Sequence, residues 1–257
     1  MRTVRTVADV RAALTALRAD GRIGLVPTMG AFHAGHEALL AAARAECDTV
    51  VVSLFVNPAQ FGEAADLERY PRDEERDAAI AAEAGADLLF APAAEEMYPE
   101  GFQTWIDVTE LGSILEGTFR PGHFRAVATV CCKLFNIVRP NVAYFGQKDA
   151  QQVSVVRRMA HDLDLELDIR VVPTVREDDG LALSSRNVLL SPAERRRATV
   201  LSRALATGDP AAARQMLDGV DVDYVEVAPF DPPVLAAAVR IGGVRLIDNV
   251  VLAKGAD

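Results

Sequence analysis

The sequence predicts an α/β protein, with a doubly wound, Rossmann-like parallel sheet followed by a small α+β C-terminal domain. Up to residue 172, short apolar runs typical of buried parallel strands alternate with longer segments of helical composition. The runs at 22–27 and 49–56 flank a helical segment at 36–46, which makes a βαβ unit that is right-handed by default. Beyond Pro173 the helical segments come first and β-patterned segments follow. We therefore predict two domains, residues 1–174 and residues 175–257.

Each element of the first domain has a local signal. Thr6 and Asp9 predict a capping box for a first helix through about Ala19, which Gly21 ends. Apolar runs indicate the strands, and segments without a breaker indicate the helices. After the βαβ unit we expect a helix at 73–84, a strand at 87–90, a strand at 103–108 in an otherwise irregular stretch, a helix at 126–138, a strand at 142–145, a helix at 149–163 and a strand at 167–172.

The second domain begins with a strong helix start. Ser191 takes the N-cap position, Pro192 the first helical position, and Glu194 closes a capping box. A second helix is expected at 210–217, and β-patterned segments lie at 224–227 and 244–247. These signals predict a small α+β unit.

Composition disfavours several classes of function. Half of the 257 residues are hydrophobic, and the net charge is −10, with a pI of about 5.0. An acidic chain lacks the basic surface that nucleic-acid binding needs. No apolar run approaches the roughly 20 residues that span a bilayer, and residues 1–5 do not resemble a signal segment. Three cysteines, an odd number, indicate reduced thiols. We expect a cytoplasmic protein with neither nucleic-acid nor membrane partners.

The stretch from Pro27 to His36 is the most informative motif. It lies between the first strand and the following helix, where α/β sheets bind ligands and helix N-termini attract phosphate. Gly30 and Gly35 let the backbone approach a ligand closely, and His33 and His36 can each donate a hydrogen bond to a phosphate oxygen. The pattern His-x-Gly-His resembles the signature of the adenylyl-transferring superfamily, which includes nucleotidylyltransferases and class I aminoacyl-tRNA synthetases.

Two other interpretations of the histidine pair stay open. Imidazole is a common zinc ligand, but the chain has only four histidines and its cysteines have no Cys-x-x-Cys spacing. The two rings can also simply cap a helix. The glycine pattern matches neither a dinucleotide fingerprint nor a P-loop.

Further polar groups follow other predicted strands and turns. Lys148 and Asp149 lie beyond the 142–145 strand, with Gln152 one helical turn later. Ser184, Ser185 and Arg186 follow a flexible turn and suit a polyphosphate clamp. Each of these segments, and a cationic one at 120–125, also fits an ordinary solvated loop.

Taken together, the motifs resemble the pantothenate synthetase (pantoate–β-alanine ligase) family over nearly the whole chain. The matching residues are Pro27-Thr28-Met29-Gly30, His33-Ala34-Gly35-His36, Asn57-Pro58-x-Gln60-Phe61, Asp66-Leu67-x-x-Tyr70-Pro71-Arg72, Arg120-Pro121-Gly122-His123-Phe124, Gly146-x-Lys148-Asp149-x-Gln151-Gln152, Pro173-Thr174-Val175-Arg176-Glu177, Gly180-Leu181-Ala182, Ser184-Ser185-Arg186-Asn187 and Leu246-Ile247-Asp248-Asn249.

The chain departs from this family's pattern at a few places. Phe32 stands where leucine is usual, Ala126 where glycine is usual, and Leu183 where methionine is usual. The Phe32 and Leu183 changes roughly conserve volume. The C-terminal domain is also shortened around 207–222 and 229–234, which puts in doubt how its lid closes over ATP.

The resemblance implies an ATP-dependent ligase that forms pantothenate, AMP and pyrophosphate through a pantoyl adenylate. It implies a nucleotide- and pantoate-binding first domain, a lid-like second domain, Mg²⁺ on the phosphates and a homodimer. The catalytic residues implied are His36, Lys148 and Arg186. The ATP-binding set adds Met29, Gly30, His33, Gly146, Asp149, Val175, Leu183, Ser184 and Ser185. Pantoate and β-alanine would contact Asn57, Gln60, Tyr70 and Gln152, and Asp77 is a candidate for a metal-water contact.

Two alternatives come from other classes. One is a nucleotidylyltransferase acting on a phosphorylated substrate, which two glutamines in place of an arginine cluster disfavour. The other is a nucleotide-binding regulator without turnover, which the presence of His36, Lys148 and Arg186 together disfavours.

Overall fold

The computed structural model describes residues 1–18, 21–62 and 64–253, and the chain divides into two compact units. The first comprises Met1–Phe145 and Val155–Val172. The second comprises Gly146–Ser154 and the chain from Pro173 onward. The units separate at Pro173, close to the boundary predicted after residue 174. Grouping of Gly146–Ser154 with the second unit was not predicted.

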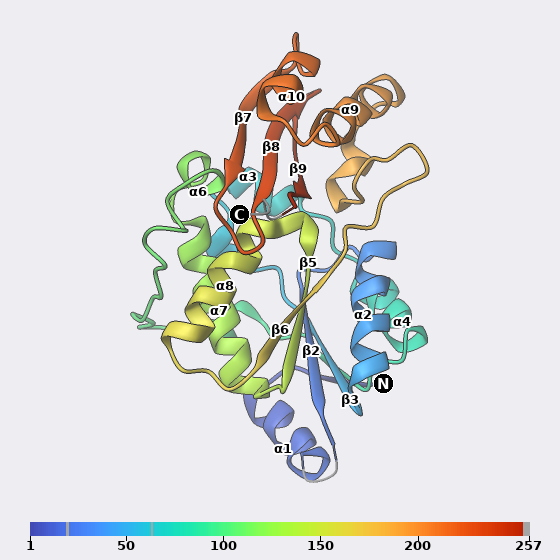
Figure 1. Ribbon diagram of the computed structural model, residues 1–257. Coiled ribbons are helices and arrows are strands. Elements are labelled where there is room, and N and C mark those ends of the chain that lie inside the picture. The colour runs from blue at the N-terminus through green and yellow to red at the C-terminus, as the bar shows by residue number, and fades with distance from the viewer. Residues whose placement is uncertain (19–20, 63, 254–257) are drawn as a thin grey trace. The chain divides into compact units, whose positions relative to one another are not determined.

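A six-stranded sheet forms the centre of the first unit (Figure 1). The chain adds β3 and then β4 on one side of β2 and returns to place β5 on the other side. Pairing is parallel between β2 and β3, β2 and β5, β3 and β4, and β1 and β4. The predicted doubly wound sheet is confirmed. Its order is β1 (Arg2–Val4), β4 (Leu88–Phe90), β3 (Thr49–Leu54), β2 (Ile23–Thr28), β5 (Val142–Gly146) and β6 (Asp168–Val172).

Helices cover both faces of this sheet (Figure 1). α2 (Ala34–Glu46) and α4 (Glu74–Glu83) lie on one face, and α7 (His123–Val138) and α8 (Ala150–Asp162) on the other. α1 (Val7–Leu17) packs against α7. Apolar side chains of α2 pack on β2, β3 and β4 in one buried cluster, which holds this helix against the sheet.

Three expectations for the first unit need correction or completion. The strand expected at 103–108 is wrong, since that segment has no strand pairing. Instead Trp105 packs on Phe102 and Tyr98, and the Ile106 N–H donates to Thr129 Oγ1 on α7. β1 was not predicted, and the expected end of the first helix at Ala19 lies outside the described residues. Further short helices occur at α3 (Ala64–Arg69), α5 (Ala94–Met97), α6 (Glu116–Phe119) and the 3-10 turn η1 (Pro58–Gln60).

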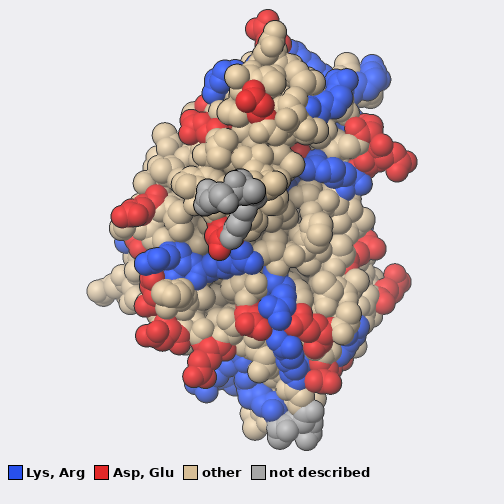
Figure 2. Space-filling view, viewed as in Figure 1, with Lys and Arg blue, Asp and Glu red and all other residues tan. Residues whose placement is uncertain are grey.

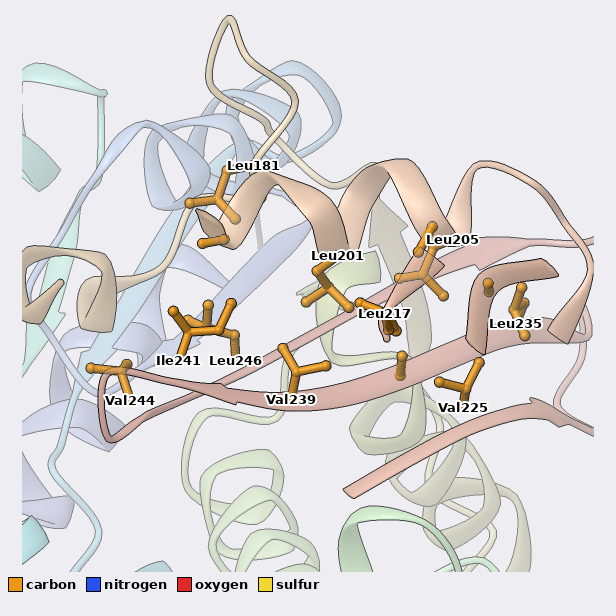
Figure 3. Close-up of a cluster of buried hydrophobic side chains, with 14 residues drawn as sticks. Leu181, Leu201, Leu205, Leu217, Val225, Leu235, Val239, Ile241, Val244 and Leu246 are labelled. Atoms are coloured by element: carbon orange, nitrogen blue, oxygen red, sulfur yellow. The ribbon is translucent and has the colours of Figure 1, made fainter. Parts of the chain in front are cut away.

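The second unit is built on a three-stranded antiparallel sheet, β7-β8-β9. The predicted capping box at Ser191 and Glu194 is confirmed at the start of α9. Leucines of α9 point toward the sheet and pack on its apolar face (Figure 3). The elements are η2 (Gln147–Asp149), η3 (Ser185–Leu189), α9 (Pro192–Leu205), α10 (Pro210–Met216), β7 (Asp221–Ala228), β8 (Val234–Ile241) and β9 (Val244–Val251), of which β8 was not predicted.

Charged side chains of both signs intermix on the face shown in Figure 2. The net charge of −10 is therefore not gathered there into one acidic area.

None of the described helices is long and apolar enough to cross a membrane.

Candidate active site

The turn between β2 and α2 has an unusual backbone that a buried carboxylate holds in place. Gly30 and Ala31 both have positive φ, 86° and 54°. Asp77 of α4, 1% exposed, accepts from the Ala31 N–H at 2.7 Å and the Phe32 N–H at 2.8 Å, with one oxygen each. A Cβ at Gly30 would lie 2.8 Å from Asp77 Oδ2, so glycine is required there. This geometry favours a positioning role for Asp77 over the metal contact expected from the sequence.

Both histidines of the motif use Nδ1 to cap α2. His33 Nδ1 accepts from the Gly35 N–H at 3.1 Å, and His36 Nδ1 accepts from the His33 N–H at 3.3 Å. The His36 ring also stacks on Phe32, with ring centroids 4.9 Å apart. Because Nδ1 is the acceptor in each ring, a neutral imidazole here carries its proton on Nε2. Capping and donation to a phosphate thus use different atoms of one ring, and the two interpretations are compatible.

The metal interpretation of the pair finds no cluster to support it. Within the described ranges, no group of three or more His, Cys, Asp or Glu side chains is arranged to hold a metal ion.

A buried amide pair follows β3. Asn57 Nδ2 donates to Gln60 Oε1 at 3.1 Å, and Gln60 Nε2 donates to the Met29 sulfur at 2.9 Å. The structure therefore brings Met29, expected at the ATP site, into contact with Gln60, expected at the pantoate site. Tyr70, also buried, packs edge-on against Phe61 with centroids 5.6 Å apart.

The start of α7 holds the backbone of this amide pair. His123 Nδ1 donates to the Gln60 carbonyl at 3.1 Å, and Arg120 donates to His123 Nε2 at 3.1 Å. The sequence motif at 120–124 had matched without any role for these two side chains. Their contacts fix the tautomer of His123 and the position of Gln60.

The second unit carries the remaining predicted residues. Lys148 lies in η2 beside Asp149, with Nζ 3.3 Å from Oδ1. Ser184 caps η3 by accepting from the Arg186 N–H, and the Leu183 N–H donates to the Val175 carbonyl at 3.0 Å. Among the described residues, Thr174 Oγ1 and Asn187 Oδ1 are buried without a hydrogen-bond partner. Such unpaired polar atoms are costly and are often satisfied by a ligand.

The predicted site residues thus form two sets, one in each unit. The first unit holds Met29, Gly30, His33, His36, Asn57, Gln60, Tyr70 and Asp77, and the second holds Gly146, Lys148, Asp149, Gln152, Val175, Leu183, Ser184, Ser185 and Arg186.

Comparison with known protein families gives one match over nearly the whole chain. Residues 2–251 match the family model described as pantoate-beta-alanine ligase. The pantothenate synthetase of Pelotomaculum thermopropionicum is 50% identical over an alignment of 281 positions. The alignment covers 99% of this chain and all of that protein.

Solved structures agree with this match. The crystal structure of the pantothenate synthetase of Thermus thermophilus has a TM-score of 0.91 and 49% identity, covering 98% of this chain and 99% of that one. A Francisella tularensis pantoate-beta-alanine ligase, complexed with beta-gamma ATP and beta-alanine, has a TM-score of 0.88 and 35% identity, covering 98% of this chain and 97% of its own.

Proposed function

The chain belongs to the pantoate-β-alanine ligase family, and from this premise we propose that it joins pantoate to β-alanine through a pantoyl adenylate. It is an enzyme, a ligase that forms an amide bond. The finer proposal has two steps. A pantoate carboxylate oxygen attacks the α-phosphorus of ATP and pyrophosphate leaves. The amine of β-alanine then attacks the acyl carbon and AMP leaves.

The observation that carries this proposal is the pair of capping histidines at the α2 N-terminus. Helix N-termini attract phosphate, and the Nδ1 caps orient each ring with its neutral-form proton on Nε2. Neither step needs a covalent protein nucleophile, so the protein's work is positioning and charge stabilisation. We assign the α-phosphate to His36 and adjacent phosphate oxygens to His33.

In this proposal, residues of the second unit bind the phosphates that leave as pyrophosphate. Lys148, Ser184, Ser185 and Arg186 would hold pyrophosphate as negative charge grows on it. Val175, Gly146 and Asp149 would position ribose and adenine, together with Met29, Gly30 and Leu183. Mg²⁺ would be held mainly by phosphate oxygens, where it neutralises charge, because the described residues offer no ligand cluster.

Pantoate recognition is assigned to amides. Asn57 and Gln60 form a buried, mutually bonded pair, which pre-orients their remaining donors and acceptors. Gln152 and Tyr70 complete the proposed set. Amides suit a small hydroxy acid, since they both donate and accept without adding charge. The F. tularensis relative complexed with beta-gamma ATP and beta-alanine supports the choice of nucleotide and amine.

Product analysis tests the proposal. Purified enzyme with ATP, Mg²⁺, β-alanine and pantoate carrying ¹⁸O in its carboxylate should yield pantothenate, pyrophosphate and AMP that contains one ¹⁸O. The label reaches AMP only if the carboxylate oxygen has bonded to the α-phosphorus. ADP as the nucleotide product would mean carboxyl-phosphate chemistry and would overturn the proposal. A panel of amines of different lengths, run in parallel, tests the choice of β-alanine.

We further propose that the enzyme is a homodimer, on family resemblance. Light scattering at micromolar concentration should give a mass near twice the 27.6 kDa of the chain. A monomer at that concentration would contradict this assembly.

A further inference from the structure

A buried asparagine of β9 holds the turn that carries Lys148. Asn249, 4% exposed, donates through Nδ2 to the carbonyls of Gln147 and Lys148, both at 2.9 Å. Its Oδ1 accepts from Gln147 Nε2 at 2.9 Å. The Asn249 amide thus makes three hydrogen bonds to one 3-10 turn, over about a hundred residues of sequence.

The preceding residue holds a second segment of the same unit. Asp248, buried, accepts from Arg176 at 2.6 and 3.0 Å in a bidentate pair. Arg176 follows Val175 and also donates to the Gly180 carbonyl at 3.1 Å. Asp248 in turn accepts from the Asn249 N–H at 2.8 Å, so the two contacts form one network.

Backbone hydrogen bonds connect this network to a third segment, residues 184–186. Arg176 and Ala182 form an isolated β-bridge, and the Leu183 N–H donates to the Val175 carbonyl. The bridge fixes where the chain enters Ser184, Ser185 and Arg186. Asp248 and Asn249, two consecutive residues of β9, are therefore linked by hydrogen bonds to three segments of the second unit. These are the η2 turn, the segment at 175–176 and, through the β-bridge, the segment at 184–186.

We propose that Asp248 and Asn249 are positioning residues for nucleotide binding. They act through the Lys148 turn and the Val175–Arg176 segment, and they need not touch the nucleotide themselves. The inference rests on the proposed function for its kinetic consequences, but nucleotide binding tests it separately. Removing the two Nδ2 donors would let η2 shift, and displacement of a binding group by about 1 Å can cost a hundredfold in rate.

The discriminating variant is Asn249→Asp. It keeps the shape and an oxygen for Gln147 Nε2, but it places a carboxylate oxygen against two carbonyls. The matched control is Asp223→Asn on β7, a largely buried side chain of the same sheet that pairs with Arg240 and Arg245 instead. Both variants perturb the sheet, but only the first touches the Lys148 turn.

Two measurements are compared. Calorimetry should show that Asn249→Asp weakens binding of a non-hydrolysable ATP analogue about tenfold or more, while Asp223→Asn stays within twofold of wild type. Rapid-quench kinetics should show slower pantoyl adenylate formation in Asn249→Asp and unchanged aminolysis of preformed adenylate. Wild-type enzyme that binds the analogue but forms no adenylate would refute the proposed function and leave the binding test of this inference intact.

Equal weakening of analogue binding by both variants, or no weakening by Asn249→Asp, would overturn the inference. If Asn249→Asp does not fold, Gln147→Met takes its place, since it removes only the bond to Asn249 Oδ1 and keeps the side-chain length. A loss of analogue affinity of threefold or more in that variant supports the inference, and unchanged affinity rejects it.

Discussion

Asp77 shows how one buried carboxylate shapes the turn that carries both histidines. Its two oxygens each accept a backbone N–H from the turn, at 2.7 and 2.8 Å. Ala31 there has a φ of 54°, a region that non-glycine residues enter only when their surroundings hold them. The carboxylate therefore stabilises a strained backbone, and the direction of His33 and His36 depends on it.

We expect Asp77→Asn to lower both stability and adenylation. An amide offers one oxygen and sets an NH₂ group against the second backbone N–H, which is left unpaired at a cost of roughly 1–3 kcal/mol. Urea denaturation should show this loss of unfolding free energy. Asp73→Asn, which keeps the N-cap of α4 and removes the same charge nearby, serves as the control.

A magnesium titration separates the two interpretations of Asp77. If the residue held a metal-bound water, raising Mg²⁺ should restore the rate of Asp77→Asn. A rate that stays low at all Mg²⁺ concentrations, together with reduced stability, supports positioning.

Gln60→Ala should raise the pantoate KM strongly and the ATP KM little. The variant leaves polar groups of a buried ligand unpaired, roughly 1–3 kcal/mol of lost binding. Gln152→Ala should act in the same direction, and the exposed Gln103→Ala should change neither constant. Steady-state kinetics in both substrates tests this, and a collapse of ATP affinity with normal pantoate affinity would refute the assignment.

The sequence predicts strands at 22–27 and 49–56, and the loops that follow parallel strands lie at one edge of a sheet. The hydrogen bond from Gln60 to Met29 joins the loops that follow these two strands. The partners that orient these loops could not be read from the sequence. Asp77 meets the turn from 45 residues away, and His123 meets Gln60 from 63 residues away. Only the tertiary fold brings such pairs together.

Among the helices and strands, those with one clear local sequence signal were predicted correctly. The capping box at Ser191 predicted α9 correctly, and the apolar runs at 22–27 and 49–56 predicted β2 and β3. β8 was missed because its alanine-rich, continuously apolar run gives no alternation, being buried at nearly every position. The strand predicted at 103–108 does not form; Trp105 packs on Phe102 there, and the Ile106 N–H donates to Thr129 of α7.

Ion pairs join the end of α2 to the sheet and predict a pH effect. Arg170 donates to Glu46 at 3.0 Å, and the Tyr144 hydroxyl donates to it at 2.9 Å. The hydrogen bond from Arg170, followed by that from Tyr144, lowers the pKa of Glu46 below its ordinary value of 4.5. A lowered folded-state pKa stabilises the protein above the unfolded pKa, and this contribution is lost as pH falls through the folded value.

Glu46→Gln should therefore lower the urea midpoint at pH 6–7, and the gap from wild type should shrink as pH falls below about 4.5. Urea denaturation across pH 3–7 measures it. Glu83→Gln, at an exposed position of α4, controls for the loss of a charge. A gap that stays constant, or grows, toward low pH would contradict the ion-pair explanation.

For the whole molecule, the division into two units separates the proposed chemical tasks. The first unit carries the histidine turn and the amide pair, and the second carries Lys148 and Arg186. The sequence placed Lys148 with the first domain, because it follows a strand of that sheet. Contacts with Asn249 group it with the second unit instead, and no local pattern could have indicated this. Both phosphate-binding cations of the proposal therefore belong to one compact body.

This grouping predicts that losing either cation affects one half-reaction. Charge grows on pyrophosphate as it departs, so Lys148→Ala should slow pantoyl adenylate formation by about 10²–10³. Aminolysis of preformed adenylate by β-alanine should change little, because pyrophosphate has already gone. Arg186→Ala should behave alike, and His36→Ala should also slow adenylation, through the α-phosphate.

Rapid-quench kinetics that follow the two steps separately provide the measurement. Lys133→Ala removes a lysine of α7 that lies over the Phe102 ring and has no role in the proposal, and it controls for the lost charge. If Lys148 merely shaped its loop, its loss would lower the melting temperature without selecting a step. Equal slowing of both half-reactions by Lys148→Ala would rule out the phosphate-binding role, because a group that holds pyrophosphate has nothing left to hold once the adenylate has formed.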